Sequence, residues 1–183
     1  MFLVKKEKKC SMKTIKEKIQ EAELVLVGIG EKFAPKDETE QVKAAYQNLA
    51  KLLDGKNYFI ITTGTDELIY EAGLKEDRIV RPLAAEETTP EEERTDSLRP
   101  SRWEMYMKWL QGTLNRKLFV LELGVGLKYP EIIRFPFEKV VYFNQKADFV
   151  RVHDKLFQLP AEMNGRGSSV KEDPVALLAD FEN

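Results

Sequence analysis

Residues 117–130 read Lys-Leu-Phe-Val-Leu-Glu-Leu-Gly-Val-Gly-Leu-Lys-Tyr-Pro, and this stretch decides the fold. Leu118 to Leu123 is a short run rich in apolar residues, and it ends at Gly124-Val125-Gly126. Such a run with glycines at its C-terminal end predicts a buried strand of a parallel sheet. Glycines let the backbone turn sharply and let a ligand approach it closely. Because ligands of open α/β sheets bind beyond the carboxyl ends of the strands, the stretch predicts both an architecture and a candidate site.

Two other stretches have the same form. Leu24-Val25-Leu26-Val27 runs into Gly28-Ile29-Gly30, and Tyr58 to Thr63 runs into Gly64-Thr65-Asp66. A single Gly-x-Gly would be a weak signal, whereas the repeated pattern is the most specific feature of the chain. The alternative is that these glycines make tight turns and bind nothing. Backbone N–H groups at such turns can bind anionic oxygens without the help of side chains.

Composition limits the classes of function. The chain has 183 residues, which fits one domain with a substantial core, and its net charge of −2 argues against nucleic acid as a main partner. Cys10 is the one cysteine, so an internal disulfide and a Cys-x-x-Cys zinc site are excluded. The sequence has no apolar stretch near the roughly 20 residues that a membrane span needs. We therefore expect a cytoplasmic protein without zinc, nucleic acid or membrane as partners.

The predicted domain organisation is simple. Residues 1–11 are expected to form a basic N-terminal tail, and residues 12–183 a single domain. Residues 84–102 are rich in glutamate with almost nothing apolar, which predicts an acidic mobile loop. Helical spacing of apolar residues predicts helices from about residue 12, over 38–54, from 103 to 114 and from 174 to 181. A further short helix is expected from Asp66 to Gly73.

The region after the central strand has two interpretations. Residues 140–143 and 148–152 both have strand propensity, so they could form a hairpin. Alternatively, residues 131–144 form a crossover and only 148–152 enters the sheet, since a parallel crossover needs a dozen or more residues.

At its three glycine loops the chain resembles the sirtuins, the family of NAD-dependent protein deacylases. Residues 24–30 resemble the strand and Gly-Ala-Gly loop that opens the sirtuin Rossmann domain. Residues 62–66 stand where sirtuins carry a Thr-Gln-Asn-x-Asp motif, and residues 124–127 where they carry Gly-Thr-Ser-Leu. The chain is more similar still to bacterial sirtuin-like proteins with Glu-Leu-Gly-Val-Gly, a proline and then Ile-Ile-Arg/Lys-x-Pro-Phe, which here spans Glu122 to Phe137. The resemblance covers most of residues 24–181.

The departures from the sirtuin pattern concern catalysis. The catalytic histidine would follow the strand near Val80-Arg81-Pro82, where this sequence has none. Gly64 replaces the asparagine that would position the nicotinamide ribose, Lys32 replaces the loop serine, and the zinc cysteines are absent. The segment between Pro82 and Trp103 is too short for the zinc module. Cleavage of the nicotinamide bond needs positioned side chains that stabilise a developing cation, and these positions are eroded.

The resemblance implies a fold and a set of site residues. The expected fold is α/β, a Rossmann-like parallel sheet with helices on both faces, of the sirtuin large-domain type without the zinc-binding small domain. The expected ligand is NAD or ADP-ribose, a small-molecule nucleotide, bound without deacylase activity. The implied cofactor-binding residues are Gly28, Gly30, Thr63, Asp66, Gly124, Gly126 and His153. Asp66 is also the candidate catalytic residue, although capping its own helix is the simpler role.

Two further functions stay open. The chain could be an NAD-consuming enzyme, such as an ADP-ribosyl transferase or NAD glycohydrolase, that uses Asp66 or a glutamate in place of the histidine. It could also be a scaffold with an empty pocket that binds a protein partner, which the sequence does not identify. A pyrophosphate site filled by Lys32 or Phe33 would favour the scaffold.

Overall fold

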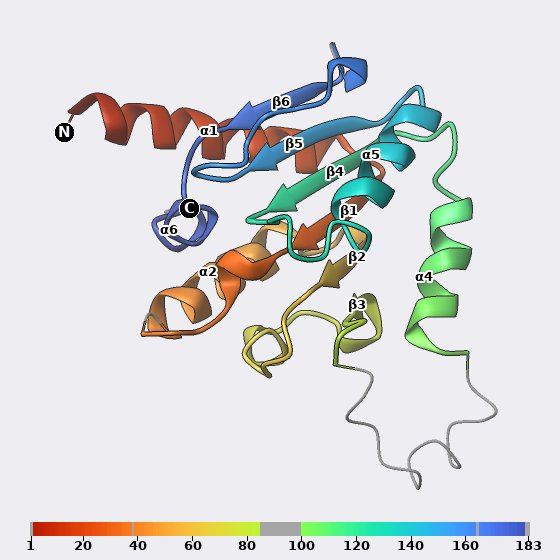
Figure 1. Cartoon of the computed structure of the whole chain (residues 1–183), viewed down its shortest axis with the longest axis horizontal. Helices are drawn as coiled ribbons and strands as arrows, with labels where there is room; N and C mark the ends of the chain where they lie inside the picture. Colours follow the sequence, from red (N-terminus) through yellow and green to blue (C-terminus); the bar gives the residue numbers. More distant parts are fainter. Residues whose placement is uncertain (1, 38, 85–99, 164, 182–183) are drawn as a thin grey trace, which may run out of the picture.

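The strands form one parallel sheet. We describe a computed structural model that covers residues 2–37, 39–84, 100–163 and 165–181, with side chains from residue 11 onward. The sheet has six strands in the order β3-β2-β1-β4-β5-β6, and every neighbouring pair is parallel (Figure 1). The strands are β1 Leu24–Ile29, β2 Asn57–Thr62, β3 Ile79–Val80, β4 Leu118–Leu123, β5 Asp148–Val152 and β6 Gly167–Val170. The Rossmann-like α/β fold predicted from the sequence is confirmed.

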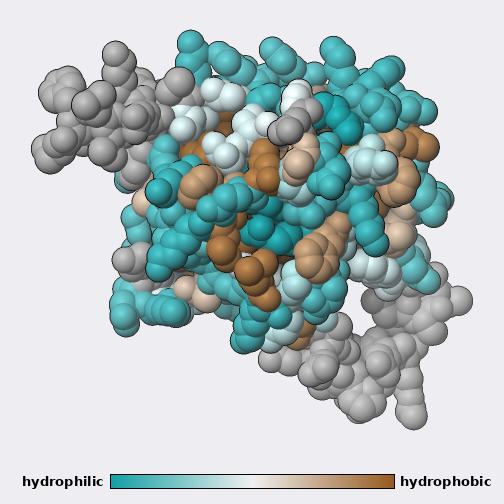
Figure 2. Space-filling view, turned by 45° about the horizontal axis from the view of Figure 1, so that its top comes forward, coloured by the Kyte–Doolittle hydropathy of each residue, from teal (hydrophilic) through white to brown (hydrophobic). Residues whose placement is uncertain are grey.

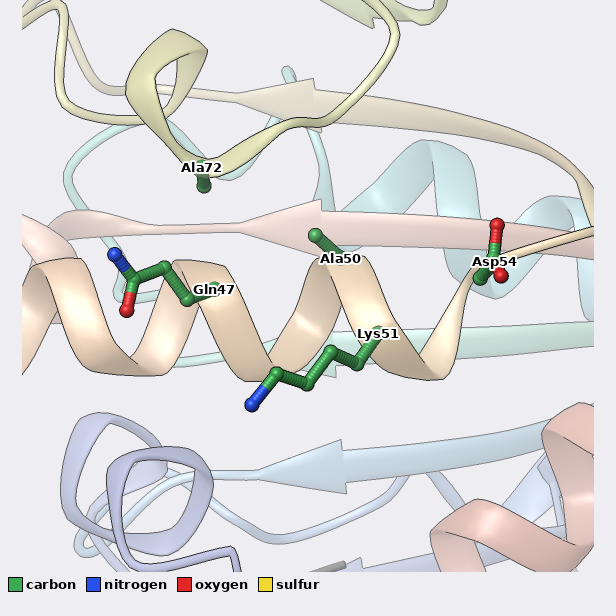
Figure 3. Close-up of a pocket in the computed structure, with 5 residues that line it drawn as sticks. All are labelled: Gln47, Ala50, Lys51, Asp54 and Ala72. Carbon is green, nitrogen blue, oxygen red and sulfur yellow. The ribbon is translucent and has the colours of Figure 1, made fainter.

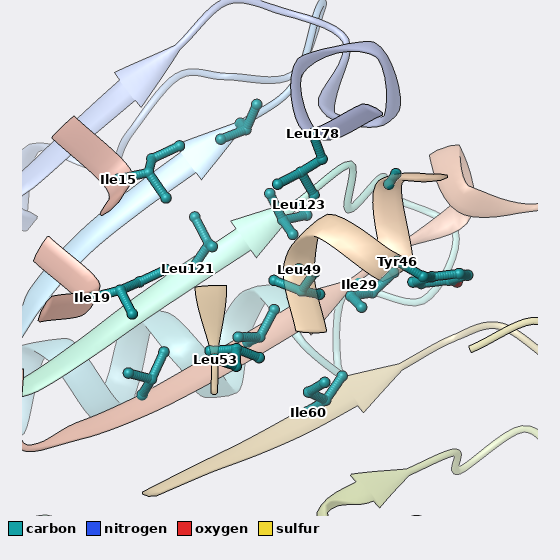
Figure 4. Packing of buried hydrophobic residues seen from close by; sticks show 14 of the residues in the cluster. Ile15, Ile19, Ile29, Tyr46, Leu49, Leu53, Ile60, Leu121, Leu123 and Leu178 are labelled. Carbon is teal, nitrogen blue, oxygen red and sulfur yellow. The ribbon is translucent and has the colours of Figure 1, made fainter. Parts of the chain in front are cut away.

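Helices cover both faces of the sheet. They are α1 Phe2–Glu21, α2 Thr39–Leu52, α4 Arg102–Gln111, α5 Arg134–Phe143 and α6 Pro174–Ala179. One core packs α1, α2 and α6 against side chains such as Val25 and Val27 of β1. Figure 4 shows part of this core, including Ile19 of α1, Leu49 of α2 and Leu178 of α6. The other core packs α4 and α5 against the alternate residues Leu24 and Leu26. Both faces of β1 and β4 are thus covered by the rest of the chain, which explains sequences that are hydrophobic almost throughout, with Glu122 as the charged exception in β4.

The strand order places a switch point beside β1. The chain moves outward from β1 to β2 and β3, and then returns to lay β4 on the other side of β1. The register pairs Ile29 at the end of β1 with Leu123 at the end of β4. The loops that follow the two strands therefore start level with each other, at the position where open α/β sheets form a ligand crevice.

Two local predictions differ from the structure. The basic tail expected over residues 1–11 is part of α1, which begins at Phe2, because lysine and glutamate are good helix formers. The helix expected from Asp66 to Gly73 is replaced by turns and a short 3-10 turn at Tyr70–Ala72. Arg81 donates to the carbonyl oxygens of Asp66 and Thr65 at 3.0 and 3.1 Å, which occupies acceptors that an α-helix would use. So short a segment also gains too few bonds to offset helix nucleation.

The structure decides between the two interpretations of residues 131–152. Residues 140–143 belong to α5, and β5 pairs in parallel with β4, so the crossover is correct and the hairpin is wrong. Strand β6 had no counterpart in the sequence prediction. Its Gly-Ser-Ser-Val sequence is polar because its serine side chains are exposed at the sheet edge.

Two remaining expectations concern regions or properties outside the sheet. Most of the acidic loop expected at residues 84–102 lies outside the described residues, which omit 85–99. Within the described part, no helix is both long and apolar enough to cross a bilayer.

The face of the molecule in Figure 2 is mostly hydrophilic, with a small group of hydrophobic residues near its centre. Some apolar exposure of this kind is normal for a folded chain.

Candidate functional site

The glycine loops meet at the carboxyl edge of the sheet. The Gly30 N–H donates to Leu123 O at 2.9 Å, and the Thr63 N–H donates to Ile29 O at 3.0 Å. A Cβ atom on Gly30 would lie 2.4 Å from the Val125 Cα and 2.5 Å from Gly124 O. The two loops therefore touch backbone to backbone, and this contact requires glycine at position 30.

Gly28 has a different environment from the other site glycines. It lies inside β1, and a Cβ atom there would be 2.4 Å from the Ile133 Cγ2 and 2.7 Å from the ring of Phe137. These atoms belong to α5 and the residue before it. The contacts thus assign Gly28 to close packing of α5 on the sheet.

The loop after β4 depends on the conformation of its first glycine. Gly124 has a φ of +64°, in the left-handed region that favours glycine. A Cβ atom there would lie 2.5 Å from the Lys32 Cβ and 3.0 Å from the Pro174 Cγ. The stem of Lys32 therefore lies over Gly124, at the position where the sequence predicted part of a pyrophosphate cradle.

Gly126 presents its amide to a carboxylate. The Gly126 N–H donates to Glu31 Oε2 at 2.7 Å. Glu31 begins the 3-10 turn Glu31–Phe33 that follows β1. A short hydrogen bond from a backbone amide to an ionised oxygen is of the strong, charge-assisted kind. The geometry shows that this amide is suited to an anionic oxygen, which in this structure comes from the chain itself.

Lys32 links the first loop to the loop after β5. Its Nζ lies 2.9 Å from Asp154 Oδ1 and 3.0 Å from Oδ2. Burial alone would raise the pKa of Asp154, but the hydrogen bond and positive charge of Lys32 outweigh burial and lower that pKa. Phe33 is buried with its ring centroid 5.3 Å from that of Tyr46, so it packs into the core.

A buried charge network lies behind the β4 loop. Glu122 is fully buried and neighbours Arg151 across the β4–β5 register. Arg151 donates through Nε to Glu122 Oε1 at 2.8 Å and through Nη2 to Oε2 at 3.1 Å, and Nη2 also donates to Glu138 at 2.7 Å. Arg134 Nη2 lies 3.6 Å from Glu122 and donates to Val125 O at 2.8 Å. The network therefore connects the sheet interior to the glycine loop.

The ionisation of this network is set by opposing effects. Burial raises the pKa of Glu122, and the positive charges of Arg151 and Arg134 act against that rise. Burial alone would lower the pKa of Arg151, but the charge and hydrogen bonds of Glu122 outweigh it and raise that pKa. The pair is ionised, because a two-point contact is the geometry of a guanidinium group with a carboxylate.

His153 follows β5 and is buried, with 5% of its surface exposed. Its Nδ1 lies 3.0 Å from the amide of Lys155 and 3.1 Å from that of Leu156, and it accepts both hydrogens. Nδ1 also lies 3.0 Å from Asp154 Oδ1, which would accept a hydrogen from a protonated ring. The two amide donors on Nδ1 place the hydrogen of the neutral ring on Nε2. Burial lowers the pKa of His153, Asp154 opposes this effect, and Lys32 and Arg134 add to it.

The lowered pKa of His153 gives a pH dependence of stability. In the window between the lowered pKa and the ordinary histidine pKa of 6.5, the unfolded chain binds more protons than the folded one. His153 thus stabilises the fold fully above pH 6.5, and this contribution is lost as the pH falls through the folded pKa. We expect the melting temperature to fall more between pH 7.5 and 5.5 in the wild type than in His153→Asn, which keeps an acceptor but does not titrate. An NMR titration midpoint of this single histidine above 6.5 would contradict the assignment.

Thr63 and Asp66 lie on the third loop. Thr63 is buried, and its backbone joins the end of β1 as described above. Asp66 Oδ1 accepts the amide hydrogen of Leu68 at 3.0 Å, so this carboxylate stabilises a local turn. Its predicted catalytic role has no supporting contact among the described residues. Within the same part of the chain, no three His, Cys, Asp or Glu side chains gather as a metal site requires.

Two surface hollows lie elsewhere. One, of about 430 Å³, is lined by Gln47, Ala50, Lys51 and Asp54 of α2 and its end, together with Ala72 (Figure 3). The other, of about 290 Å³, lies between α5 and the 3-10 turn Ala161–Met163. Both are open depressions rather than enclosed clefts.

The sequence placed Glu31 near the candidate site, but no site role was predicted for Glu31, Arg134 or Arg151. A signal for Arg151 was available, because a charged residue in a predicted buried strand requires a partner, and Glu122 stands in the other such strand. Glu31 carried no comparable signal, since an exposed loop glutamate is ordinary. Its contact with Gly126 joins residues 95 positions apart.

Comparison with known proteins identifies the fold. No family model matches the chain. A mutant Sir2 homologue in complex with ADP-ribose has a TM-score of 0.52 and 12% identity, covering 91% of this chain and 94% of its own. A structure described as the basis for the mechanism and regulation of Sir2 enzymes has a TM-score of 0.51 and 11% identity, covering 90% of this chain and 92% of its own. The chain therefore has a sirtuin-like fold.

One curated protein is similar in sequence. A protein ADP-ribosyltransferase of Staphylococcus aureus (strain Mu50 / ATCC 700699) is 25% identical over 73 residues. The match spans 40% of this chain and 23% of that protein.

Proposed function

We propose that the carboxyl edge of the sheet binds the ADP-ribose moiety of NAD or free ADP-ribose, without deacylase activity. The observation that carries this proposal is the amide of Gly126, which lies at the switch point between β1 and β4 and donates to an anionic oxygen at 2.7 Å. A diphosphate oxygen has the charge and acceptor chemistry of that carboxylate. The complex of a Sir2 homologue with ADP-ribose supports the choice of ligand.

The absence of deacylase activity rests on the sequence. The residues near Val80 contain no histidine, and the single histidine of the chain is His153, after β5. Its Nδ1 accepts two backbone amide hydrogens, which suits a structural or binding role better than acid–base catalysis. A loop glycine, Gly64, stands where the sirtuin motif has its ribose-positioning asparagine.

Two other functions each have an observation in their favour. The similarity to a protein ADP-ribosyltransferase favours transfer of ADP-ribose, although it spans only part of both chains. The position of the Lys32 stem over Gly124 favours a scaffold whose nucleotide site is filled. We rank ligand binding above both, because Gly126 and Glu31 form a charge-assisted bond that an incoming diphosphate can replace.

A calorimetric titration of the full chain with ADP-ribose and NAD tests the proposal. We expect saturable binding and a rise in melting temperature, because a ligand at 100 times its Kd stabilises the folded state by about 2.7 kcal/mol. Adenosine is the control, since it lacks the diphosphate and should bind much more weakly. With NAD and an acetyl-lysine peptide we expect no deacetylation.

The outcomes separate the three functions. Release of nicotinamide from NAD, abolished by one substitution in this chain, would replace the proposal with an NAD-consuming enzyme. Suppose that ADP-ribose up to millimolar concentration neither binds nor shifts the melting temperature, both in the wild type and in variants that remove side chains from the glycine loop. The protein-binding scaffold would then be the remaining function.

A further inference from the structure

Glu31 occupies the position that an anionic ligand would take. Its Oε2 is 2.7 Å from the Gly126 amide nitrogen. A Cβ atom on Gly126 would lie 3.1 Å from the same oxygen and 3.5 Å from Oε1, so the carboxylate covers this glycine. A phosphate oxygen and the Glu31 carboxylate cannot both accept this N–H at such distances, because the two anions would overlap and repel.

The turn that carries Glu31 is held closed by several contacts. The Lys32 amide donates to Gly124 O at 3.3 Å, and the Ala34 amide donates to Glu31 O at 3.1 Å. The side chain of Lys32 is paired with Asp154, while Phe33 is anchored in the core beside Tyr46. The backbone of the turn is therefore held by contacts that do not involve the Glu31 carboxylate, and a rotation of that side chain would leave them in place.

The surrounding charges show what this rotation would change. With Glu31 in place, the loop presents carboxylates from Glu31 and Asp154 and an ammonium group from Lys32. Rotation of Glu31 into solvent removes one negative charge from the crevice and frees the Gly126 amide. A diphosphate arriving there would then meet a free backbone donor and less repulsion, while the Lys32 ammonium group stays paired with Asp154.

We propose that Glu31 is an internal competitor for the crevice, which occupies the Gly126 amide and sets the affinity of the chain for a diphosphate-containing nucleotide. This inference rests on the proposed function. The apparent Kd is the intrinsic Kd divided by the fraction of molecules in which Glu31 has rotated away. Removing the competitor therefore strengthens binding, because the ligand no longer has to break the hydrogen bond between Glu31 and Gly126.

The test compares ADP-ribose binding by the wild type, Glu31→Ala and Glu31→Gln. We expect Glu31→Ala to bind at least about tenfold more tightly, because a hydrogen bond to a charged group contributes a factor of this size or more. Glu31→Gln keeps an acceptor oxygen but loses the charge, so its affinity should fall between the two. Glu17→Ala makes the same charge change on the exposed face of α1 and should leave the affinity unchanged.

A second readout follows the amide itself. In the free protein, the Gly126 amide resonance should move upfield in Glu31→Ala, because it loses a short hydrogen bond. Addition of ADP-ribose to Glu31→Ala should move it downfield again. Inorganic pyrophosphate serves as a probe of the anion position without the nucleoside.

Each outcome decides the inference. Tighter binding by Glu31→Ala supports it, including the case in which only this variant binds. Equal or weaker binding by Glu31→Ala, with a wild type that binds, overturns the competitor role but leaves the proposed function intact. Absence of binding by every variant overturns both together.

Discussion

Replacement of Arg151 by methionine is expected to destabilise the fold by about 3–5 kcal/mol, the cost of breaking a buried ion pair from one side. Arg151 is 1% exposed and makes a two-point contact with Glu122, which is fully buried. Without Arg151, the nearest remaining cation among the described residues is Arg134 at 3.6 Å, so the Glu122 charge loses its main partner. Glu138 is 23% exposed and can turn toward water, so the cost falls mainly on Glu122.

Urea denaturation of Arg151→Met measures this loss, with the slope m checking that both proteins unfold in the same way. Arg116→Met is the matched control, because Arg116 pairs with Glu23 on the surface, where the two side chains are 47% and 48% exposed. Exposed pairs contribute about 0–1 kcal/mol, so this variant should be nearly as stable as the wild type.

A second substitution identifies the cause of the loss. Glu122→Gln added to Arg151→Met removes the unpaired charge and should recover more than half of the stability. A loss below 1 kcal/mol in the single variant, or a double variant that is no more stable than it, would show that the pair is not ionised. The network would then have a packing role alone.

The network also explains why two sequence motifs occur together. Glu122 precedes Gly124-Val125-Gly126, and Arg134 lies in the Ile-Ile-Arg-Phe-Pro-Phe run. Arg134 donates to Val125 O at 2.8 Å and to Leu156 O at 3.1 Å, and so ties the glycine loop to the loop after β5. The glutamate of the first motif thus contributes to positioning the arginine of the second.

Strands and helices were predictable where a single physical signal dominated. The sheet core comes from apolar runs such as Leu118 to Leu123, which are buried on both faces and so carry no polar alternation. The helix at residues 174–179 was visible from its cap, since Asp173 accepts the amide hydrogens of Val175 and Ala176. In both cases the residues of the element itself were sufficient to predict it.

The rest depends on contacts between distant residues. Gly28 looked like part of a ligand loop, but its environment is set by Phe137, which the sequence separates from it by more than a hundred positions. Strand β6 lies at the side of the sheet and has exposed serines. It is held by backbone hydrogen bonds to β5, which do not depend on residue type, so its composition does not predict a strand. The contact of Glu31 with Gly126 is likewise invisible before the loops are placed.

Gly124→Val is expected to abolish ADP-ribose binding, and Gly55→Val to leave it intact. Both glycines have positive φ, +64° at Gly124 and +70° at Gly55, so both substitutions impose a similar backbone strain of about 1–3 kcal/mol. Their surroundings differ. A Cβ atom on Gly55 meets nothing within 4 Å, whereas one on Gly124 lies 2.5 Å from the Lys32 Cβ. Gly55 follows α2 and precedes β2, so it lies at the amino ends of the strands, away from the carboxyl ends that form the candidate site.

The comparison therefore separates the effect of backbone strain from the effect of a side chain that blocks the candidate site. Valine at position 124 would displace Lys32 and place a branched side chain in the path of the ligand, while valine at position 55 would only weaken the fold. A domain of 183 residues should remain folded after either loss. ADP-ribose should raise the melting temperature of the wild type and of Gly55→Val by linkage, and leave that of Gly124→Val unchanged. Unchanged affinity in Gly124→Val would show that the ligand does not bind at this loop. Loss of binding in Gly55→Val would show that general destabilisation is enough to prevent binding.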